Sequence, residues 1–364
     1  MRLSWSTAAC GLLALLVSPA VVFAIATPDV KAAADVRTHH LPYRLVTQLP
    51  DEVWIENIAV RSNGNLLLTT VHPNASLYEV QDPSSQSPKV TLLFTIDTIN
   101  SLFGIAETSP DVFAVAGGNF DFITGTSPGS YALWSVDFSK GATPNPKLIT
   151  SLPGAYMING VGVVPSQPNN VLLADSTKNV IWHVDIKTAN VSLAVVPRPA
   201  PGHTLPAPIL GKPSIGINGV HVNREGLIVW SDRNATANPT TGQLETAVYL
   251  VPTTKDGYQL GHGVPDRVLT LPTTALDDFT WGPGYSQTLW IATNLDNRVF
   301  AVKKGEKFVV AGDVNSPEFA TATACQFGRT AKDRSILYVT TGGVINGTYT
   351  RGGRVQALDT TGFC

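Results

Sequence analysis

The sequence contains few charged residues and no excess of basic ones. Charged side chains make up 14% of the 364 residues, and the formal net charge is −2. Without a basic surface, the chain lacks the electrostatic footprint of a nucleic-acid-binding protein, and we expect no such partner. Glycine (31 residues) and proline (26 residues) are plentiful by contrast. That composition favours short strands joined by turns and argues against a helical or a disordered chain.

Cysteine is scarce as well. Cys10, Cys325 and Cys364 are the three that the sequence contains, too few for a metal site built on thiolates. Cys10 lies in an apolar N-terminal segment that is typical of a removable leader, so two cysteines remain. Two cysteines in an oxidising compartment most simply pair. We therefore expect a Cys325–Cys364 disulfide that fixes the C-terminal end.

Long apolar runs are absent beyond the N-terminus. The run from Ala8 to Val17, followed by the small-x-small step Ala24-Ile25-Ala26, predicts a secretory signal peptide over residues 1–26. An uncut signal anchor is the alternative. Residues 27–40 would form a mobile N-terminal segment, followed by one domain over residues 41–364. Because no second run of about 20 apolar residues occurs, we expect no membrane span in the mature chain.

Four Asn-x-Ser/Thr sequons agree with a secretory route. They predict a secreted, glycosylated protein, with acceptor residues at Asn74, Asn190, Asn234 and Asn346.

Two common catalytic signatures are also missing. No Gly-x-Ser-x-Gly elbow occurs, which argues against a serine hydrolase of that kind. No glycine-rich loop follows a strand and opens a helix, which argues against a phosphate-binding site of that type.

What the sequence does contain is a repeat. The stretch Gly216–Trp230, GINGVHVNREGLIVW, combines an Asn-Gly step, an alternating strand, a polar turn and a second apolar strand. Looser copies, spaced by roughly 45 to 60 residues, begin at Glu56, Phe103, Asn159, Asp278 and Thr323. A period of that size made of short strands indicates propeller blades. We predict an all-β, six-bladed β-propeller with four antiparallel strands in each blade.

The N-terminal strand is predicted to close the ring. Residues 43–49 form a strand with no partner before it, and they resemble the outermost strand of the other copies. The last copy ends after its third strand, at residues 355–358. The N-terminal strand would therefore complete the sixth blade and remove an open sheet edge.

Polar residues open four of the copies: Glu56, Asn159, Asn218 and Asp278. Because the innermost strands of a propeller surround its axis, we expect these side chains to converge. Carboxylate and amide oxygens suit Ca²⁺, and a metal there would support lactone or ester hydrolysis. The alternative is structural, since Asn-Gly is a common turn pair and carboxylates also bind backbone amides.

Long loops are predicted on the same rim as these residues, and we expect them to cover a pocket over the axis. They span residues 117–130, 197–217, 231–246 and 341–353.

The repeats and the Glu-Asn-Asn-Asp set resemble the gluconolactonase and senescence-marker-protein propellers over residues 43–358. The resemblance implies a divalent metal held by Glu56, Asn218 and Asp278, with Asp277 as a substitute for the aspartate, and it places Asn159 on the substrate side. Two departures stand out. Phe279 follows the aspartate where that family usually has glycine, and residues 57–58 replace a small residue and a proline after the glutamate.

The chain is more similar to a secreted fungal branch of these propellers, with the same signal, sequons and WIENIAVRSNGNLLLTT opening. That branch includes the hetero-Diels–Alderases of tropolone sesquiterpenoid biosynthesis, which join a tropolone-derived quinone methide to a humulene-type sesquiterpene. The resemblance implies two small apolar substrates and no cofactor for the cycloaddition, while Ca²⁺ at the axis stays open. The alternatives are a Ca²⁺-dependent lactonase or esterase and a non-enzymatic secreted binding propeller.

A cycloaddition would use the same axial residues in other roles. Glu56 or Asp278 would move the proton when a quinone methide forms by loss of water. Amide donors and flat apolar walls would hold the two partners. These candidates are Asn57, Asn159, Asn218, Phe103, Phe279, Trp281 and Thr323. For each aromatic residue, packing inside a blade is the alternative. The sequence does not indicate an oligomeric state.

Overall fold

The computed structural model describes residues 36–141, 144–197, 215–260, 264–284 and 286–363. All of them lie in one compact unit, Asp35–Cys364. The predicted signal peptide falls in the other unit, Met1–Ala34, and lies outside the described residues. No helix long and apolar enough to cross a bilayer occurs in the described part of the chain.

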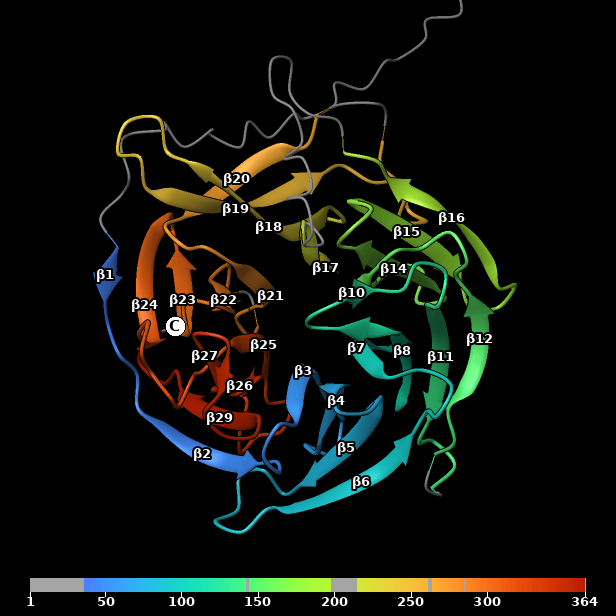
Figure 1. Ribbon diagram of the computed structural model, residues 1–364, viewed down its shortest axis with the longest axis horizontal. Coiled ribbons are helices and arrows are strands. Elements are labelled where there is room, and N and C mark those ends of the chain that lie inside the picture. Colours follow the sequence, from blue (N-terminus) through green and yellow to red (C-terminus); the bar gives the residue numbers. More distant parts are fainter. Residues whose placement is uncertain (1–35, 142–143, 198–214, 261–263, 285, 364) are drawn as a thin grey trace, which may run out of the picture. The chain divides into compact units, whose positions relative to one another are not determined.

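Six four-stranded antiparallel sheets form the blades of a propeller, as predicted (Figure 1). Blade 1 contains β3 (Trp54–Val60), β4 (Leu66–His72), β5 (Ser76–Gln81) and β6 (Lys89–Thr95). Blade 2 contains β7 (Ser101–Ser109), β8 (Val112–Gly118), β11 (Ala132–Asp137) and β12 (Lys147–Ser151). Blade 3 contains β13 (Ile158–Val163), β14 (Asn170–Asp175), β15 (Val180–Asp185) and β16 (Asn190–Val195).

The remaining blades follow in chain order. Blade 4 contains β17 (Ile217–Val222), β18 (Ile228–Ala237), β19 (Leu244–Val251) and β20 (Asp266–Leu271). Blade 5 contains β21 (Leu276–Trp281), β22 (Leu289–Thr293), β23 (Arg298–Lys303) and β24 (Glu306–Gly312). Blade 6 contains β25 (Ala322–Phe327), β26 (Ile336–Thr341), β29 (Arg354–Asp359) and β2 (Tyr43–Gln48).

The N-terminal strand closes the ring. Strand β2 pairs antiparallel with β29, which confirms that the first long strand completes the sixth blade. Ahead of it, residues 36–40 were predicted to belong to a mobile segment. The structure instead pairs β1 (Arg37–Thr38) in parallel with β24, and the His39 amide donates to the Val309 carbonyl at 2.9 Å.

Six hydrophobic clusters hold the blades together, one at each interface between neighbouring blades. In β4, Leu66 and Leu68 pack toward blade 6, whereas Leu67 packs toward blade 2. Every blade is therefore buried on both faces. This explains why the second strands read as continuous apolar runs instead of alternating ones. Burying one such leucine contributes roughly 2 to 3 kcal/mol.

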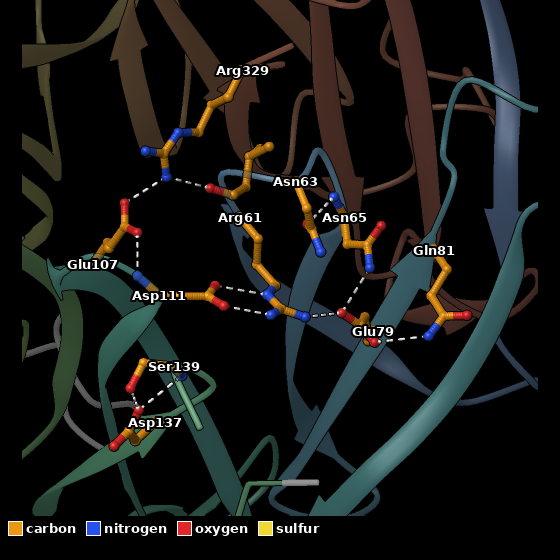
Figure 2. Close-up of polar contacts among 11 residues, drawn as sticks. Arg61, Asn63, Asn65, Glu79, Gln81, Glu107, Asp111, Asp137, Ser139 and Arg329 are labelled. Carbon is orange, nitrogen blue, oxygen red and sulfur yellow. Dashed lines mark hydrogen bonds and ion pairs between the residues drawn. The ribbon is translucent and has the colours of Figure 1, made fainter. Parts of the chain in front are cut away.

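An ion-pair network links three blades on the rim formed by the turns between first and second strands (Figure 2). Arg61 of blade 1 binds Asp111 of blade 2 through two nitrogens, at 2.8 and 2.6 Å, and also reaches Glu79. Arg329 of blade 6 donates to Glu107 of blade 2 and to a backbone carbonyl of blade 1. Two-pronged, partly buried arginine contacts of this kind fix geometry.

The predicted Cys325–Cys364 disulfide is not supported. Cys325 is free and buried, and its thiol lies 3.4 Å from the Trp290 carbonyl oxygen. Cys364 lies outside the described residues. Since apolar clusters already fill the interface of Cys325, its role in the structure is that of a small buried hydrophobe.

Two of the predicted glycosylation sites, Asn74 and Asn346, lie on loops; Asn190 begins β16 and Asn234 lies within β18. Asn74, Asn190 and Asn346 are exposed, and Asn234 is half-buried. Their modification stays a prediction.

Candidate active site at the ring axis

All six inner strands carry a β-bulge at the same place. In β13, for example, Ile158 pairs with Asp175 but the next pair is Val161 with Leu173, so one extra residue is inserted. The equivalent shift occurs in the other five inner strands. A bulge of this kind re-aims side chains, and the inserted positions begin with Glu56, Phe103, Asn159, Asn218, Asp277 and Thr323.

Side-chain hydroxyls of the second strands satisfy the amides that the bulges release. The amides of Asn57 and Gly219 donate to Thr69 and Ser231 at 3.1 and 2.9 Å. Each hydroxyl then donates to the inner strand of the next blade, Thr69 to Phe103 and Ser231 to Asp277. The bulges are therefore held in place by links between blades, which gives the axis a rigid lining.

The Asn-Gly steps are not turns. Gly160 and Gly219 lie inside strands, where neighbouring backbone approaches closely. A Cβ at Gly160 would lie 2.4 Å from the Asn218 carbonyl oxygen, and one at Gly219 would lie 2.2 Å from Asp278. Glycine is required because inner strands meet there. This replaces the turn interpretation of the pair.

Glu56 is a buried carboxyl with a strongly shifted pKa. Burial raises the pKa of Glu56 to about 7, and the hydrogen bond from Trp54 and the charge of Arg233 only partly oppose this. The Trp54 indole nitrogen donates to Glu56 Oε2 at 2.9 Å. At neutral pH such a carboxyl is present in both its protonated and its ionised form, which suits a group that gives and takes a proton.

The pKa values of the neighbouring aspartates Asp277 and Asp278 are shifted in opposite directions. Asp277 occupies the bulge position equivalent to Glu56, and burial together with the negative charge of Glu56 raises its pKa well above the usual value. Asn294 donates to it at 2.6 Å. Burial alone would also raise the pKa of Asp278, but the charge and hydrogen bond of His221 outweigh it and hold that pKa below its usual value. The site thus combines two carboxyls of raised pKa, Glu56 and Asp277, with one of lowered pKa, Asp278.

A hydrogen-bonded chain crosses the axis. Asn57 of blade 1 donates to Asp278 Oδ2 at 2.9 Å, and His221 of blade 4 lies 2.7 Å from Asp278 Oδ1. The Phe279 amide also donates to Oδ1, at 2.8 Å. Blade 1 and the adjacent blades 4 and 5 are thereby joined through one carboxylate. His221 and Arg233 were missed by sequence reasoning, although His221 stands in the most regular copy of the repeat.

Asn218 carries a buried amide that is left unsatisfied. Its side chain is 1% exposed, and neither Oδ1 nor Nδ2 has a hydrogen-bond partner within the described ranges. An unmade hydrogen bond of this kind costs about 1 to 3 kcal/mol. Such a group points to a ligand that supplies the missing partner. Asn159 is likewise buried at the equivalent position of blade 3.

The axial residues fit a Ca²⁺ ion only in part. Glu56, Asn218 and Asp277 offer the oxygen atoms that Ca²⁺ prefers, and a cation would keep both carboxyls ionised. Asp278, the aspartate in the predicted ligand set, already accepts three hydrogen bonds from the protein. No group of three or more His, Cys, Asp or Glu side chains suited to a metal occurs among the residues that the structure describes.

Four of the predicted substrate-binding residues are engaged in packing or in links between blades. Phe103 packs on Phe120, and Phe279 lies in the cluster between blades 4 and 5. Trp281 is the last residue of β21, at the rim opposite to the start of that strand. The Thr323 hydroxyl donates to the Ile55 carbonyl at 2.9 Å and so joins blades 6 and 1.

Aromatic side chains from two hairpins gather beside Glu56. The hairpin of β9 (Phe120–Asp121) and β10 (Gly125–Thr126) reaches toward the centre of the ring (Figure 1). The hairpin of β27 (Val344–Ile345) and β28 (Thr348–Tyr349) extends from blade 6. Both come from loops predicted to cover the axis. We call Trp54, His72, Phe120, Phe122 and Tyr349 the rim aromatic cluster, since successive ring centroids lie 4.8 to 6.1 Å apart.

The two best-defined hollows lie away from the axial carboxyls. One, of about 340 Å³, lies between blades 1 and 2 and is lined by polar residues that include Asn74, Asp97 and Asn100. The other, of about 400 Å³, adjoins the ion-pair network on the opposite rim, between Pro110, Pro165 and Arg329. Neither hollow is lined by Glu56, Asn218, Asp277 or Asp278. Most of the predicted loop 197–217 lies outside the described residues.

Comparisons with known proteins give two close sequence relatives. A protein from a Phoma species, named "putative hetero-Diels-Alderase", is 31% identical over 322 residues, which cover 82% of this chain and 86% of the relative. A protein of the same description from Sarocladium schorii is 30% identical over 355 residues, covering 89% and 84%. No family model matches the sequence.

Solved structures support the fold. A calcium-binding regucalcin from Agrobacterium tumefaciens aligns with a TM-score of 0.59 at 15% identity, over 89% of this chain and 95% of that one. A luciferin-regenerating enzyme aligns with the same TM-score at 13% identity, over 88% and 96%. The architecture is thus that of the regucalcin-like propellers.

Proposed function

We propose a specific reaction for this chain, which belongs to the hetero-Diels-Alderase family and is a cycloaddition-catalysing enzyme. In the proposed reaction, the enzyme joins a tropolone-derived quinone methide to a humulene-type sesquiterpene. The observation that carries the family-level function is the similarity to two hetero-Diels-Alderases over more than 80% of the chain. The raised pKa of Glu56 and the lowered pKa of Asp278 support the choice of the quinone methide.

Glu56 would form the quinone methide. Its proton passes to the hydroxyl that leaves from the hydroxylated tropolone, the C–O bond breaks, and water departs. The resulting Glu56 carboxylate then takes the proton of the ring hydroxyl and returns to its starting state. A pKa of about 7 suits both directions of transfer. One residue can therefore balance the protons of the whole dehydration.

Asn218 would bind the oxygen that gains charge in the cycloaddition. As the new C–C and C–O bonds form, electron density shifts at the quinone methide oxygen, and a fixed donor lowers the barrier. The Asn218 amide is buried and has no partner among the described residues, so it is available for this contact. Holding two apolar partners together supplies several kcal/mol more.

The test is direct. Purified protein is incubated with the hydroxylated tropolone and humulene, and the adducts are separated by chiral chromatography with mass detection. We expect one stereoisomer, formed faster than in heat-denatured protein. A racemic mixture at the uncatalysed rate would exclude the proposed reaction.

A Ca²⁺-dependent lactonase is the second candidate, and the unpartnered Asn218 amide oxygen is the observation that favours it. When bound, Ca²⁺ would polarise a lactone carbonyl. Chelation separates the two, because the cycloaddition should persist in EDTA whereas lactone hydrolysis should stop and return with added Ca²⁺.

A further inference from the structure

We propose that the tip of the β9–β10 hairpin, Phe122 and Ile123, is the surface that binds the olefin and selects among olefins. This inference rests on the proposed function, because it names the partner at the same site. The structure offers three independent reasons: the exposure of the tip, the chemistry of its turn, and its contact with the residue that holds Glu56.

The tip exposes apolar surface at a place where loops converge. Ile123 is 90% exposed and Phe122 is 48% exposed. The neighbouring Asp121 is polar and also exposed, so the hairpin carries both polar and apolar side chains on its surface. Exposed single hydrophobes are common, but here two adjacent ones stand on a hairpin that reaches toward the ring centre (Figure 1).

The turn that carries these residues is fixed by hydrogen bonds to Asp121. Asp121 Oδ1 accepts from the amides of Ile123 and Thr124 at 2.8 and 2.7 Å, and from the Thr124 hydroxyl at 3.1 Å. Because these donors are already used, the side chains that the tip offers to a partner are the apolar ones of Phe122 and Ile123. A hydrocarbon without polar groups is the partner that suits it, whereas the oxygen-rich tropolone suits the axial carboxyls and amides.

The tip is continuous with the proposed catalytic residue. The Phe122 ring lies 4.8 Å from the Trp54 ring, and Trp54 donates the hydrogen bond that holds Glu56. An olefin resting on Phe122 would therefore lie one indole ring away from the carboxyl that makes the quinone methide. On the far side of the same cluster, Tyr349 carries a buried hydroxyl with no partner in the described chain. We expect that hydroxyl to hydrogen-bond an oxygen of the tropolone, the polar partner of the reaction.

Steady-state kinetics with two varied substrates tests this assignment. Phe122→Ala and Ile123→Ser should each raise KM for humulene by about ten- to a hundred-fold, the range that a lost apolar contact spans, and should leave KM for the hydroxylated tropolone unchanged. Leu148→Ser is the matched control, because Leu148 is 54% exposed on the outer strand β12. It should change neither constant.

The readouts separate two kinds of failure. If the wild type forms adduct but both tip variants keep the wild-type KM for humulene, the hairpin does not bind the olefin. If the wild type forms no adduct, the proposed reaction fails, and calorimetric titration of humulene alone still tests the hairpin. Weaker binding by Ile123→Ser than by Leu148→Ser would then support the olefin surface, and equal binding would overturn it.

Discussion

Replacing Glu56 by glutamine is the most informative change to this protein. Glutamine keeps the size of the side chain and an acceptor for the Trp54 indole, but it has no proton to transfer. General acid–base catalysis contributes about 10²- to 10⁴-fold. We therefore expect Glu56→Gln to slow quinone methide formation by that range.

The two steps of the reaction should respond differently. Cycloaddition of a preformed quinone methide needs a hydrogen-bond donor and no proton transfer, and the glutamine amide still donates. We expect the second step to slow by less than about ten-fold, in keeping with the 1.4 kcal/mol that a factor of ten represents. Stopped-flow absorbance of the quinone methide separates the two rates. Equal loss in both steps, or no loss in the first, would refute the assignment.

The same variant tests the shifted pKa through stability. The pKa of Glu56 rises from its ordinary value of 4.5 to about 7 on folding. The folded state thus holds the proton more tightly, and this contribution is present below pH 4.5 and is lost as the pH rises through 7. A shift of 2.5 units (7 − 4.5) corresponds to about 3 kcal/mol.

Urea unfolding at several pH values measures this effect. Between pH 5 and pH 8, the free energy of unfolding of the wild type should fall relative to Glu56→Gln by about 2.5 kcal/mol, because a small part of the total is already lost between pH 4.5 and pH 5. Asp277 titrates in the same direction in both proteins, but it cancels only in the part due to burial, because the variant also removes the Glu56 charge that helps raise the Asp277 pKa. Parallel curves for the two proteins would show that the Glu56 pKa is not raised.

Three further predictions follow from single contacts. Asn218→Leu should raise the free energy of unfolding by about 1 to 3 kcal/mol, because it removes an unsatisfied buried amide, while adduct formation falls; a less stable variant would show that the amide is already paired. Gly219→Ala should destabilise the fold by about 1 to 3 kcal/mol, since its Cβ would lie 2.2 Å from Asp278. Gly226 has open space around it but is not a suitable control, because its φ of +80° would strain an alanine there too. The comparison is therefore Gly219→Ser, whose larger side chain should destabilise the fold more than alanine does. Arg61→Met should lower the melting temperature, because the buried Glu79 carboxylate loses its ion-pair partner and keeps only the amide donors of Asn65 and Gln81. It should leave KM for both substrates unchanged; altered substrate constants would show that the opposite rim contributes to catalysis.

The architecture was predictable because it depends on patterns within short segments of the sequence. Each second strand is buried on both faces, so runs such as Leu66–Leu68 appear as continuous apolar stretches at a fixed period. The closing strand was also predictable, since residues 43–48 have no earlier partner and pair with β29. Local patterns of this kind depend on neighbours in the sequence and need no knowledge of distances across the ring.

The details of the site depend on geometry that the pattern does not contain. The bulge inserts one residue, and this places Asp277 at the position equivalent to Glu56 while Asp278 binds His221 and Asn57. Spacing alone could not tell the two aspartates apart. Loop 117–130 was predicted to cover the axis, but the role of Phe122 within it was missed for a similar reason, since Phe122 meets Trp54, 68 positions earlier (122 − 54 = 68), only after the chain between them has folded.

The most direct test of the account is a crystal structure of the protein with its cycloadduct bound. We predict the tropolone oxygens within hydrogen-bonding distance of Glu56 and Asn218, and the hydrocarbon ring against Phe122. Adduct bound instead in the hollow between Pro110 and Arg329, on the opposite rim, would contradict the central claim that the axial carboxyls form the active site.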